Sequence, residues 1–548
     1  MKTQNKKPSR RIERYSLSDM IGTRRGGFFD KCACEIRDLV PQNGSFRLRN
    51  GTVEAFTVDS PILFSGSVNN NGNITGYVSE ANLLYELMGP YNTGVSEARY
   101  ISDSSIRAED TFFFTSGGCT YMMTSGRICK RYGDEFEDFD SFGATVDVDV
   151  KKNTVTEDEC KRATNLFSGC MDIRFTLDGD GSTIRFGTPP DSVHSVTVNG
   201  TNIEDVTLDG DTLTVGCDLY AGDVVCIRAG CTASAPDSLS LTGASGENGG
   251  RTYLYSKNAM YRVSTIGDAL FCSRPVLTLP EGGLRRAFFC SGTLVLAIGE
   301  GLCVFDEEKC TLRTIGGEGA QSERSICACG GYAFVASDGY LTRLTISQSG
   351  ETETLRTETV RDVFDYRQRG EILGMAYSRA DRCLWTLVDS DEGRRIFTLD
   401  VESGIWNEIT CFSEPSAIIE CEDCIAIICG RTVYYSSPDL TYDEREDGSY
   451  PISGTLVLNP SDLGDPFSEK RAVCLAVKAS TQVTDIAVTL TTDRGREFTE
   501  KRKKEYGDVA FELFCPRLGL FRYVSAAITV TGYGNADLCG VELDVRSK

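Results

Sequence analysis

A unit of short strands recurs between residues 284 and 437, and this repeat constrains the fold more than any other feature of the sequence. Each copy has the pattern of three strands separated by tight turns, followed by a more polar fourth segment. The copies begin at Ala287, Ile326, Ile372 and Ala417, so their starts are 39, 46 and 45 residues apart. Four short strands in about 40–45 residues is the period of a β-propeller blade, and one blade cannot bury its faces without neighbours. The repeat therefore predicts several blades around an axis.

Less regular copies of the unit extend this prediction. They lie at 107–132 and 251–265, and a hairpin over Ser45–Phe56 that turns at Asn50-Gly51 is expected to supply strands to another blade. The count is then about five to seven blades. Because WD and kelch signatures are absent, we expect an irregular propeller, and an array of β-sandwiches with chance spacing is the alternative fold.

Two regions depart from the repeat. Residues 146–235 alternate apolar and polar positions around Asn-Gly and Asp-Gly turns, which predicts a small β-sandwich inserted into the propeller. A Ser/Gly-rich linker is expected to follow at 236–250. Residues 451–548 alternate again, which predicts a C-terminal β-sandwich or a closing blade.

The remaining segments complete an all-β organisation. We expect a basic N-terminal arm at 1–25, a first propeller part at 26–145 and the main blades at 251–450. The one helix expected lies near 79–87, where Ser79 would cap the first turn and Gly89-Pro90 would end it.

Composition removes several classes of function. The chain of 548 residues holds a single histidine, which leaves no site that needs two histidine ligands. The 79 Asp and Glu outnumber the 57 Lys and Arg, giving a net charge of −22 and arguing against general binding to nucleic acid. Nowhere do 18 apolar residues run together, so no membrane insertion is expected.

The basic N-terminus is the exception to the acidic balance. Residues 1–14 carry six Lys and Arg against Glu13, and no apolar stretch of a secretory signal follows them. A transit peptide would fit this composition, but it would need an apolar face. We expect a tail that docks on an acidic partner surface.

The 23 cysteines suggest reduced thiols in a cytosol, because the count is odd and no export signal is present. Most of them stand where a strand takes a small buried residue. Cys421 and Cys424 form a CxxC pair with Cys429 five residues on, but a structural zinc site needs a second pair. Metal binding by these three cysteines is left open.

Two other candidates have ordinary structural explanations. Asp178, Asp180 and Ser182 alternate as in a calcium loop, but Thr183 and Pro189 stand where an EF-hand needs Gly and Glu. We expect a hairpin turn there.

The single histidine, His194, is expected to be a structural residue of the inserted sandwich. The acidic run at 134–140 is either a docking strip or a solvated loop anchored by its two phenylalanines.

No catalytic, cofactor-binding or metal residue is predicted, and no cofactor is expected. Sialidase-type boxes are missing, and Trp385 and Trp406 both fall in one repeat. The glycines at 299–301 open no helix, so they do not bind a dinucleotide. A glycosidase with two carboxylates is the enzymatic alternative, although sequence selects no pair.

Two stretches resemble tail nozzle and tail-hub propeller proteins of bacteriophages. At the N-terminus the pattern is Asn43-Gly44 followed by Arg49-Asn50-Gly51, and at the C-terminus it is Thr492-Asp493-Arg494-Gly495 with the partly kept Leu520-Phe521-Arg522.

The resemblance implies a non-enzymatic virion protein, made in the host bacterial cytoplasm. It would form a ring, six- or twelve-fold, that contacts neighbouring virion proteins. An electronegative lumen would let DNA pass without specific binding. A propeller module that binds protein or glycan is the alternative.

Overall fold

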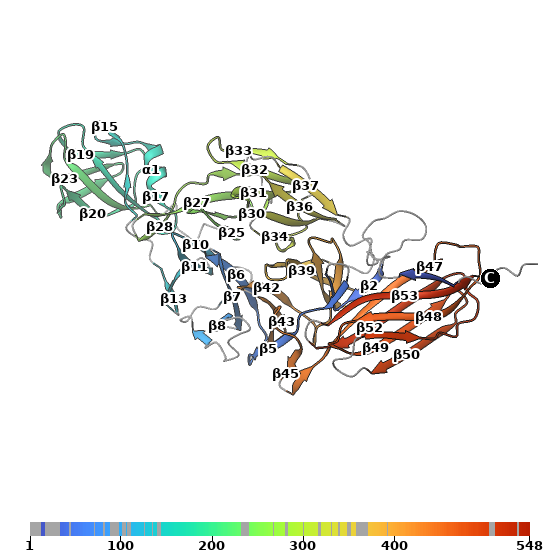
Figure 1. Cartoon of the computed structure of the whole chain (residues 1–548). Helices are drawn as coiled ribbons and strands as arrows, with labels where there is room; N and C mark the ends of the chain where they lie inside the picture. The colour runs from blue at the N-terminus through green and yellow to red at the C-terminus, as the bar shows by residue number, and fades with distance from the viewer. Residues whose placement is uncertain are drawn as a thin grey trace, which may run out of the picture.

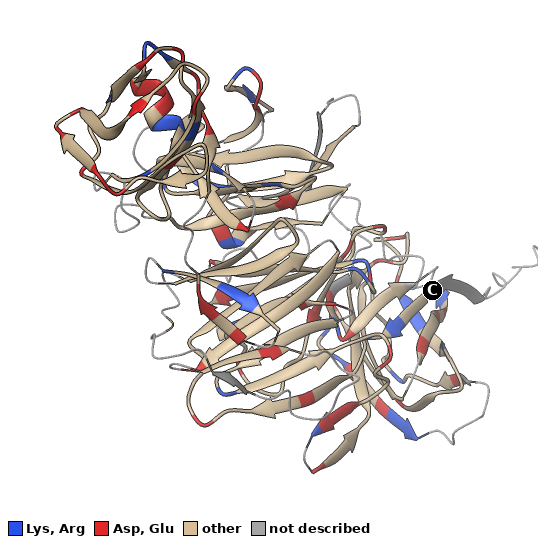
Figure 2. Ribbon diagram, turned by 90° about the vertical axis from the view of Figure 1, so that its left-hand side faces the viewer, with Lys and Arg blue, Asp and Glu red and all other residues tan. Residues whose placement is uncertain are grey.

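The computed structural model describes residues 12–16, 33–87, 98–100, 106, 111–231, 241–357, 371–503 and 510–547, apart from gaps of one to four residues inside these ranges. The molecule has three parts (Figure 1), with the inserted sandwich at one end, the C-terminal sandwich at the other and the propeller between them. Acidic and basic residues are spread over all three parts (Figure 2).

Seven antiparallel sheets form the blades of the propeller within the described residues. Blade 1 consists of β6 (Phe64–Asn70), β7 (Asn73–Glu80), β8 (Leu83–Leu87) and β9 (Ala98–Tyr100), and blade 2 of β10 (Phe112–Ser116), β11 (Cys119–Thr124), β12 (Arg127–Tyr132) and β13 (Glu135–Asp138). Blade 3 consists of β25 (Gly243–Asn248), β26 (Arg251–Tyr255), β27 (Ala259–Ile266) and β28 (Ala269–Cys272), with β29 (Leu277–Thr278) beside β27; blade 4 of β30 (Leu284–Cys290), β31 (Thr293–Ile298), β32 (Gly301–Asp306) and β33 (Thr311–Thr314); and blade 5 of β34 (Ile326–Ala328), β35 (Tyr332–Ser337), β36 (Tyr340–Ile346) and β37 (Thr352–Thr357). Blade 6 consists of β38 (Ile372–Ser378), β39 (Cys383–Ser390), β40 (Gly393–Asp400) and β41 (Trp406–Ile409), and blade 7 of β42 (Ala417–Cys421), β43 (Cys424–Cys429), β44 (Thr432–Ser436) and β5 (Thr52–Thr57). We number them blades 1 to 7 in this order.

Buried side chains between neighbouring blades hold the ring together. A separate apolar cluster lies between each pair of blades, including blade 7 and blade 1, where Val53 and Ile419 pack with Val78 and Tyr85. The ring therefore closes on itself, and the predicted all-β propeller is confirmed. Its last blade is completed by β5, whose partner β44 lies far along the chain.

The inserted sandwich leaves the propeller between blades 2 and 3. One sheet has the order β14-β18-β24-β20-β21 with β17 beside β18, and the other has the order β15-β16-β19-β23-β22. Their apolar faces enclose a separate core. The elements are β14 (Val146–Asp147), β15 (Val150–Lys151), β16 (Thr154–Val155), α1 (Glu157–Ala163), β17 (Thr164–Asn165), β18 (Cys170–Thr176), β19 (Gly181–Phe186), β20 (Ser192–Val198), β21 (Thr201–Asn202), β22 (Val206–Asp209), β23 (Thr212–Leu219) and β24 (Val224–Gly230).

The C-terminal domain is a sandwich that also takes strands from the N-terminus. One sheet has the order β3-β4-β53-β48-β51 with β1 on β53, and the other continues from β41 of blade 6 through β2-β47-β52-β49-β50. These strands are β1 (Ile12–Ser16), β2 (Ala33–Arg37), β3 (Leu39–Gln42), β4 (Ser45–Leu48), β47 (Ile452–Ser461), β48 (Lys470–Ala479), β49 (Val483–Thr492), β50 (Glu497–Lys503), β51 (Ala510–Phe514), β52 (Val524–Gly532) and β53 (Asp537–Ser547).

The expected helix near 79–87 is wrong. The segment forms the end of β7 and the whole of β8, with Ser79 opposite Leu84 and Val78 opposite Tyr85. Leu84 and Leu87 are buried between blades, and this packing outweighs the modest helical propensity of the sequence.

The hairpin expected over Ser45–Phe56 is also wrong. Strand β4 pairs with β3 and β53 in the C-terminal sandwich, whereas β5 pairs with β44 in blade 7. Residues 33–48 are therefore not part of the propeller, and Asn50-Gly51 joins two domains.

Two further boundaries need adjustment. The expected linker at 236–250 contains β25, the inner strand of blade 3, and its residues 236–240 lie outside the described residues. Within the basic N-terminal arm, Ile12–Ser16 forms a strand on β53, and residues 1–11 and 17–25 are outside the described part.

Candidate functional site

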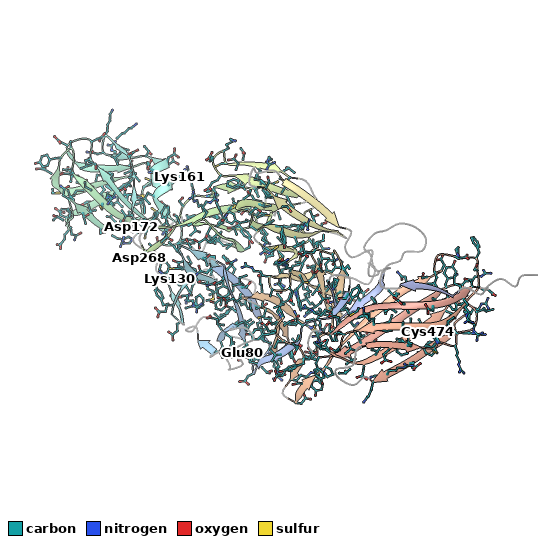
Figure 3. All side chains as sticks on the ribbon, viewed as in Figure 1. Glu80, Lys130, Lys161, Asp172, Asp268 and Cys474 are labelled. Atoms are coloured by element: carbon teal, nitrogen blue, oxygen red, sulfur yellow. The ribbon has the colours of Figure 1, made fainter. Side chains whose placement is uncertain are left out.

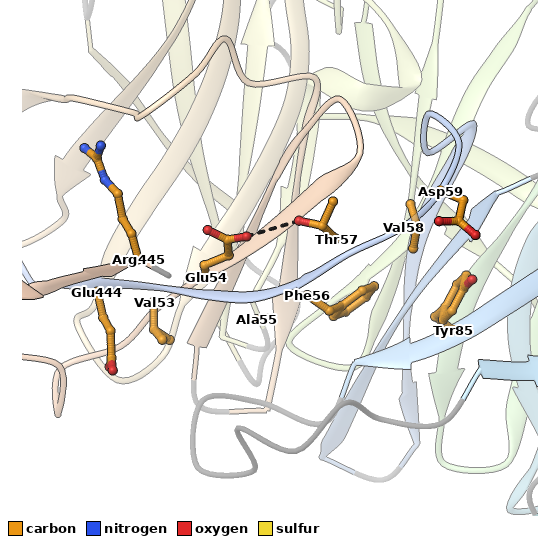
Figure 4. Close-up of a pocket in the computed structure, with 10 residues that line it drawn as sticks. All are labelled: Val53, Glu54, Ala55, Phe56, Thr57, Val58, Asp59, Tyr85, Glu444 and Arg445. Carbon is orange, nitrogen blue, oxygen red and sulfur yellow. Dashed lines mark hydrogen bonds between the residues drawn. The ribbon is translucent and has the colours of Figure 1, made fainter. Parts of the chain in front are cut away.

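A cavity of about 640 Å³ lies beside the closing strand β5 (Figure 4). We call it the β5 groove. It lies where blade 7 meets blade 1 and β45 (Asp443–Arg445), which forms a hairpin with β46 (Gly448–Tyr450). The lining residues are Val53, Glu54, Ala55, Phe56, Thr57, Val58, Asp59, Tyr85, Glu444 and Arg445.

The start of β5 is fixed by a buried polar junction. The Asp443 carboxylate accepts hydrogen bonds from the backbone N–H and the hydroxyl of Thr52, at 3.0 and 2.9 Å. It also pairs with the Arg49 guanidinium, whose other carboxylate partner is Asp38 at 2.6 Å. Gly51 is needed between them, since a Cβ there would lie 2.0 Å from the carbonyl oxygen of Tyr442. These contacts hold β5 in register.

One edge of β5 has no strand partner over most of its length in the described part of the chain. Its inner edge pairs with β44, whereas on the outer edge β45 reaches it only where Glu444 lies opposite Val53. From Glu54 to Thr57, no strand of the described chain pairs with the outer edge. Backbone N–H and C=O groups of a strand point alternately to its two edges, so this stretch presents hydrogen-bonding groups to the groove.

The inner end of the groove is apolar. The rings of Phe56 and Tyr85 lie with their centroids 5.6 Å apart, and Val58 is buried beside them. The hydroxyl of Tyr85 donates to Glu80 at 3.1 Å. Burial raises the pKa of Tyr85 to about 12, and the contact with Glu80 adds to the shift, so the phenol stays neutral. Glu80 is labelled beside this part of the propeller in Figure 3.

The rim of the groove is acidic. Glu54, Asp59 and Glu444 contribute three carboxylates, and Glu54 accepts a hydrogen bond from Thr57 (Figure 4). Among the described residues of the lining the one cation is Arg445, whose guanidinium lies 3.7 Å from the ring centroid of Phe412 and 5.0 Å from that of Tyr450. The two rings hold the guanidinium by cation–π contacts. Three carboxylates against this one cation give the rim a negative charge.

The residues considered for calcium act on the backbone instead. The Asp178 carboxylate accepts hydrogen bonds from the backbone N–H of Lys152 and Asn153, at 2.7 and 3.1 Å, and Asp180 accepts from the N–H of Ala221 at 2.8 Å. They lie in the turn between β18 and β19. The predicted hairpin is wrong, because β18 and β19 belong to the two different sheets of the sandwich and pair with β24 and β23 instead of with each other. Ser182 follows within β19.

The three cysteines considered for a metal do not come together. Cys421 and Cys424 face each other where β42 turns into β43, whereas Cys429 lies at the far end of β43, opposite Thr432. No cluster of three potential ligands occurs in the described residues. The side chain of His194 is exposed on β20 of the inserted sandwich.

The acidic run at 134–140 was expected to be either a docking strip or a solvated loop. The structure places a strand in it. Its residues Glu135–Asp138 form β13, the outer strand of blade 2, with Phe136 buried and Glu135 and Glu137 exposed. Trp385 and Trp406 both lie in blade 6, as the repeat implied.

Sequence reasoning did not find the β5 groove. Its lining comes from three segments that tertiary structure brings together, at 53–59, Tyr85 and 444–445. The one local signal is that two acids, Glu54 and Asp59, flank the largely apolar run Ala55–Val58. No helix in the described part of the chain is long and apolar enough to cross a membrane.

Comparison with known proteins gives structural neighbours but no family. No family model matches the chain, and no curated protein matches it. The extracellular domain of the putative one component system BT4673 from B. thetaiotaomicron is similar at 9% identity and a TM-score of 0.38; the alignment covers 88% of this chain and 60% of that one. The chain thus spans about 60% of the length of that structure.

Two propeller domains from fungi are similar over most of their own length. The β-propeller domain of Myceliophteria thermophila Cps50 (Swd1) shares 9% identity at a TM-score of 0.35, with 70% of this chain and 99% of that one covered. The Neurospora crassa Pan2 WD40 domain shares 8% identity at a TM-score of 0.35, with 71% and 95% covered. The strand pairing of the described residues shows a β-propeller of seven blades that carries two β-sandwiches.

Proposed function

We propose that the chain is a non-enzymatic binding module whose propeller takes an extended segment of a protein partner on the outer edge of β5. One observation carries this proposal: the stretch Glu54–Thr57, whose outer edge pairs with no described strand, borders a cavity of about 640 Å³. An added strand gains affinity from backbone hydrogen bonds and specificity from pockets that take alternate side chains.

The chemistry of the groove favours protein over glycan as the ligand. A strand edge offers N–H and C=O groups at the spacing of another strand, which a peptide backbone matches. The apolar floor of Phe56, Val58 and Tyr85 suits an aliphatic or aromatic side chain. Next to it, the carboxylates of the rim suit a basic one.

The virion role that the phage resemblance implies stays a prediction. Neither the fold nor the structural neighbours bear on it, and a binding module is compatible with it, because virion proteins assemble through such contacts. A virion protein and a binding module of another kind would therefore differ in the partner that they bind, while the groove that binds it would be the same.

Selection from a displayed library of random linear peptides tests the proposal. Peptides that bind the full chain are expected to slow amide hydrogen exchange over residues 54–57, because an added strand protects the outward N–H groups. Exchange in β13, an outer strand of blade 2, serves as the internal control. Binding peptides that leave β5 unprotected, or a selection that yields no binder, would contradict it.

A further inference from the structure

We infer that the segment that occupies the β5 groove is the basic N-terminal segment, residues 1–11, of a second copy of this chain. The inference rests on the proposed function, since it requires the groove to bind an extended segment. It adds the identity of the partner and a geometry of self-assembly.

The rim of the groove sets the charge of the occupant. Glu54, Asp59 and Glu444 face the cavity, and the guanidinium of Arg445 is held between the rings of Phe412 and Tyr450. A segment rich in Lys or Arg would place cations among three carboxylates, whereas an acidic segment would meet repulsion.

The chain itself carries a segment of the complementary charge. Residues 1–11 hold five Lys and Arg and no acid, in a chain whose net charge is −22. Eleven residues can span up to about 36 Å, and the open edge from Glu54 to Thr57 needs about 13 Å of strand, so the segment is long enough to cover it.

The segment and the groove belong to different parts of one copy. The segment immediately precedes β1, which is paired with β53 in the C-terminal sandwich, whereas the groove lies where blade 7 meets blade 1 of the propeller. A segment of one copy in a groove of the next is a heterologous contact. Repeated contacts of this kind form a ring where the rotation between successive copies closes, and an open filament where it does not.

Charge variants of the full chain test the inference. Asp59→Asn with Glu444→Gln removes two carboxylates of the rim, and both side chains lie outside the hydrophobic core. Glu135→Gln with Glu137→Gln is the matched control, because it makes the same charge change on exposed positions of β13. We expect self-association, measured by sedimentation velocity over a range of concentrations, to weaken roughly tenfold in the groove variant and not in the control.

Peptide binding separates this inference from the proposed function. A labelled peptide of residues 1–11 is expected to bind a chain that lacks those residues, and a peptide with its five Lys and Arg changed to Gln is expected to bind roughly tenfold more weakly. If selected peptides bind the groove but the peptide of residues 1–11 does not, the inference fails and the proposed function stands. If neither binds, both fail.

Two further results would overturn the inference. The first is equal association in the groove variant and the full chain, which would place the self-contact elsewhere. The second is a full chain that stays monomeric at every concentration while its groove is protected from hydrogen exchange, which would show that the segment binds within its own copy.

Discussion

Arg49 and Asp443 lie 394 positions apart in the sequence and form a two-pronged ion pair, with both guanidinium nitrogens 2.8 Å from the carboxylate oxygens. Their side chains are only 6% and 8% exposed. Asp38 pairs with the remaining Nε, so one guanidinium joins the C-terminal sandwich, the start of β5 and the strand β45 that borders the groove. Burial lowers the pKa of Arg49, but the two carboxylates raise it by more, so its charge is permanent.

Arg49→Met is expected to destabilise the protein strongly. The substitution leaves the carboxylates of Asp38 and Asp443 buried without their cation, which costs about 3–5 kcal/mol of unfolding free energy. Arg174→Met is the control, because Arg174 makes a similar two-pronged pair with Asp147 on an exposed surface, where solvent screens the charges and the loss is expected to be much smaller. Chemical denaturation measures both, and equal losses would contradict the role given to Arg49.

Gly51→Ala is expected to displace the start of β5. The added Cβ would meet the carbonyl oxygen of Tyr442 at 2.0 Å, and a backbone atom cannot rotate away as a side chain does. Forced overpacking of this kind costs about 1–3 kcal/mol. Gly301→Ala, where a Cβ meets nothing within 4 Å, is the control for the thermal unfolding measurement. If Gly51→Ala is as stable as Gly301→Ala, the backbone at the start of β5 can move to make room for the added Cβ.

The stability of the propeller is expected to depend on Glu420. Burial raises the pKa of this glutamate from 4.5 to about 7, although Arg379, 3.3 Å away, lowers it. Between these values the folded state holds a proton that the unfolded state has lost, so this glutamate makes unfolding easier as the pH rises from about 4.5 to 7.

The variant Glu420→Gln separates this contribution from other titrations. Above pH 7 it is expected to be more stable than the unchanged chain by about 1–3 kcal/mol, and near pH 4.5 the difference should vanish. Glu402→Gln, at an exposed ion pair with Arg382, should show no such dependence. A pH-independent difference for Glu420→Gln would contradict the prediction.

The cysteines are expected to react in two groups. Cys310 and Cys515 are exposed, whereas Cys272 and Cys327 are buried. Burial raises the pKa of the Cys327 thiol to about 12, and the thiolate is the reactive form. Iodoacetamide should label Cys310 and Cys515 in the native protein and the buried pair only after unfolding, as peptide mass spectrometry would show. Native labelling of Cys272 at the same rate would count against this burial.

A ring is the assembly that the phage resemblance predicts. Negative-stain microscopy of the purified chain is expected to show closed particles with six or twelve copies. Single propellers at every concentration, with the other virion components also present, would argue against a virion role without touching the proposed groove.

The sequence was most informative where strands pair with their nearest neighbours. Blades 4 to 7 were predicted because alternation and turns are local: Cys383–Ser390, for example, pairs on both sides with strands of its own repeat. The one described α-helix, Glu157–Ala163, was missed although Thr156 caps it and acids fill its first turn, because two turns are too short for a visible period.

Long-range pairing explains most of what the sequence did not show. Residues 79–87 contain good helix formers, and only the neighbouring strands decide that they form β7 and β8. The separation of β4 from β5 depends on partners hundreds of residues away, and so does the groove. No local pattern encodes these choices.

The closing strand has a consequence for how the chain is made. Thr57 leaves the ribosome 375 residues before its partner Thr432. At about 5–20 residues per second this is an interval of roughly 20–75 s. During that time β5 and blade 1 exist without the strands of blade 7 that later cover them, so the nascent chain exposes apolar surface until β44 has been made. A chain truncated before residue 424 lacks β43 and β44, so its ring cannot close. The strands made first, β5 and those of blade 1, are therefore the ones whose apolar surface chaperones would have to cover.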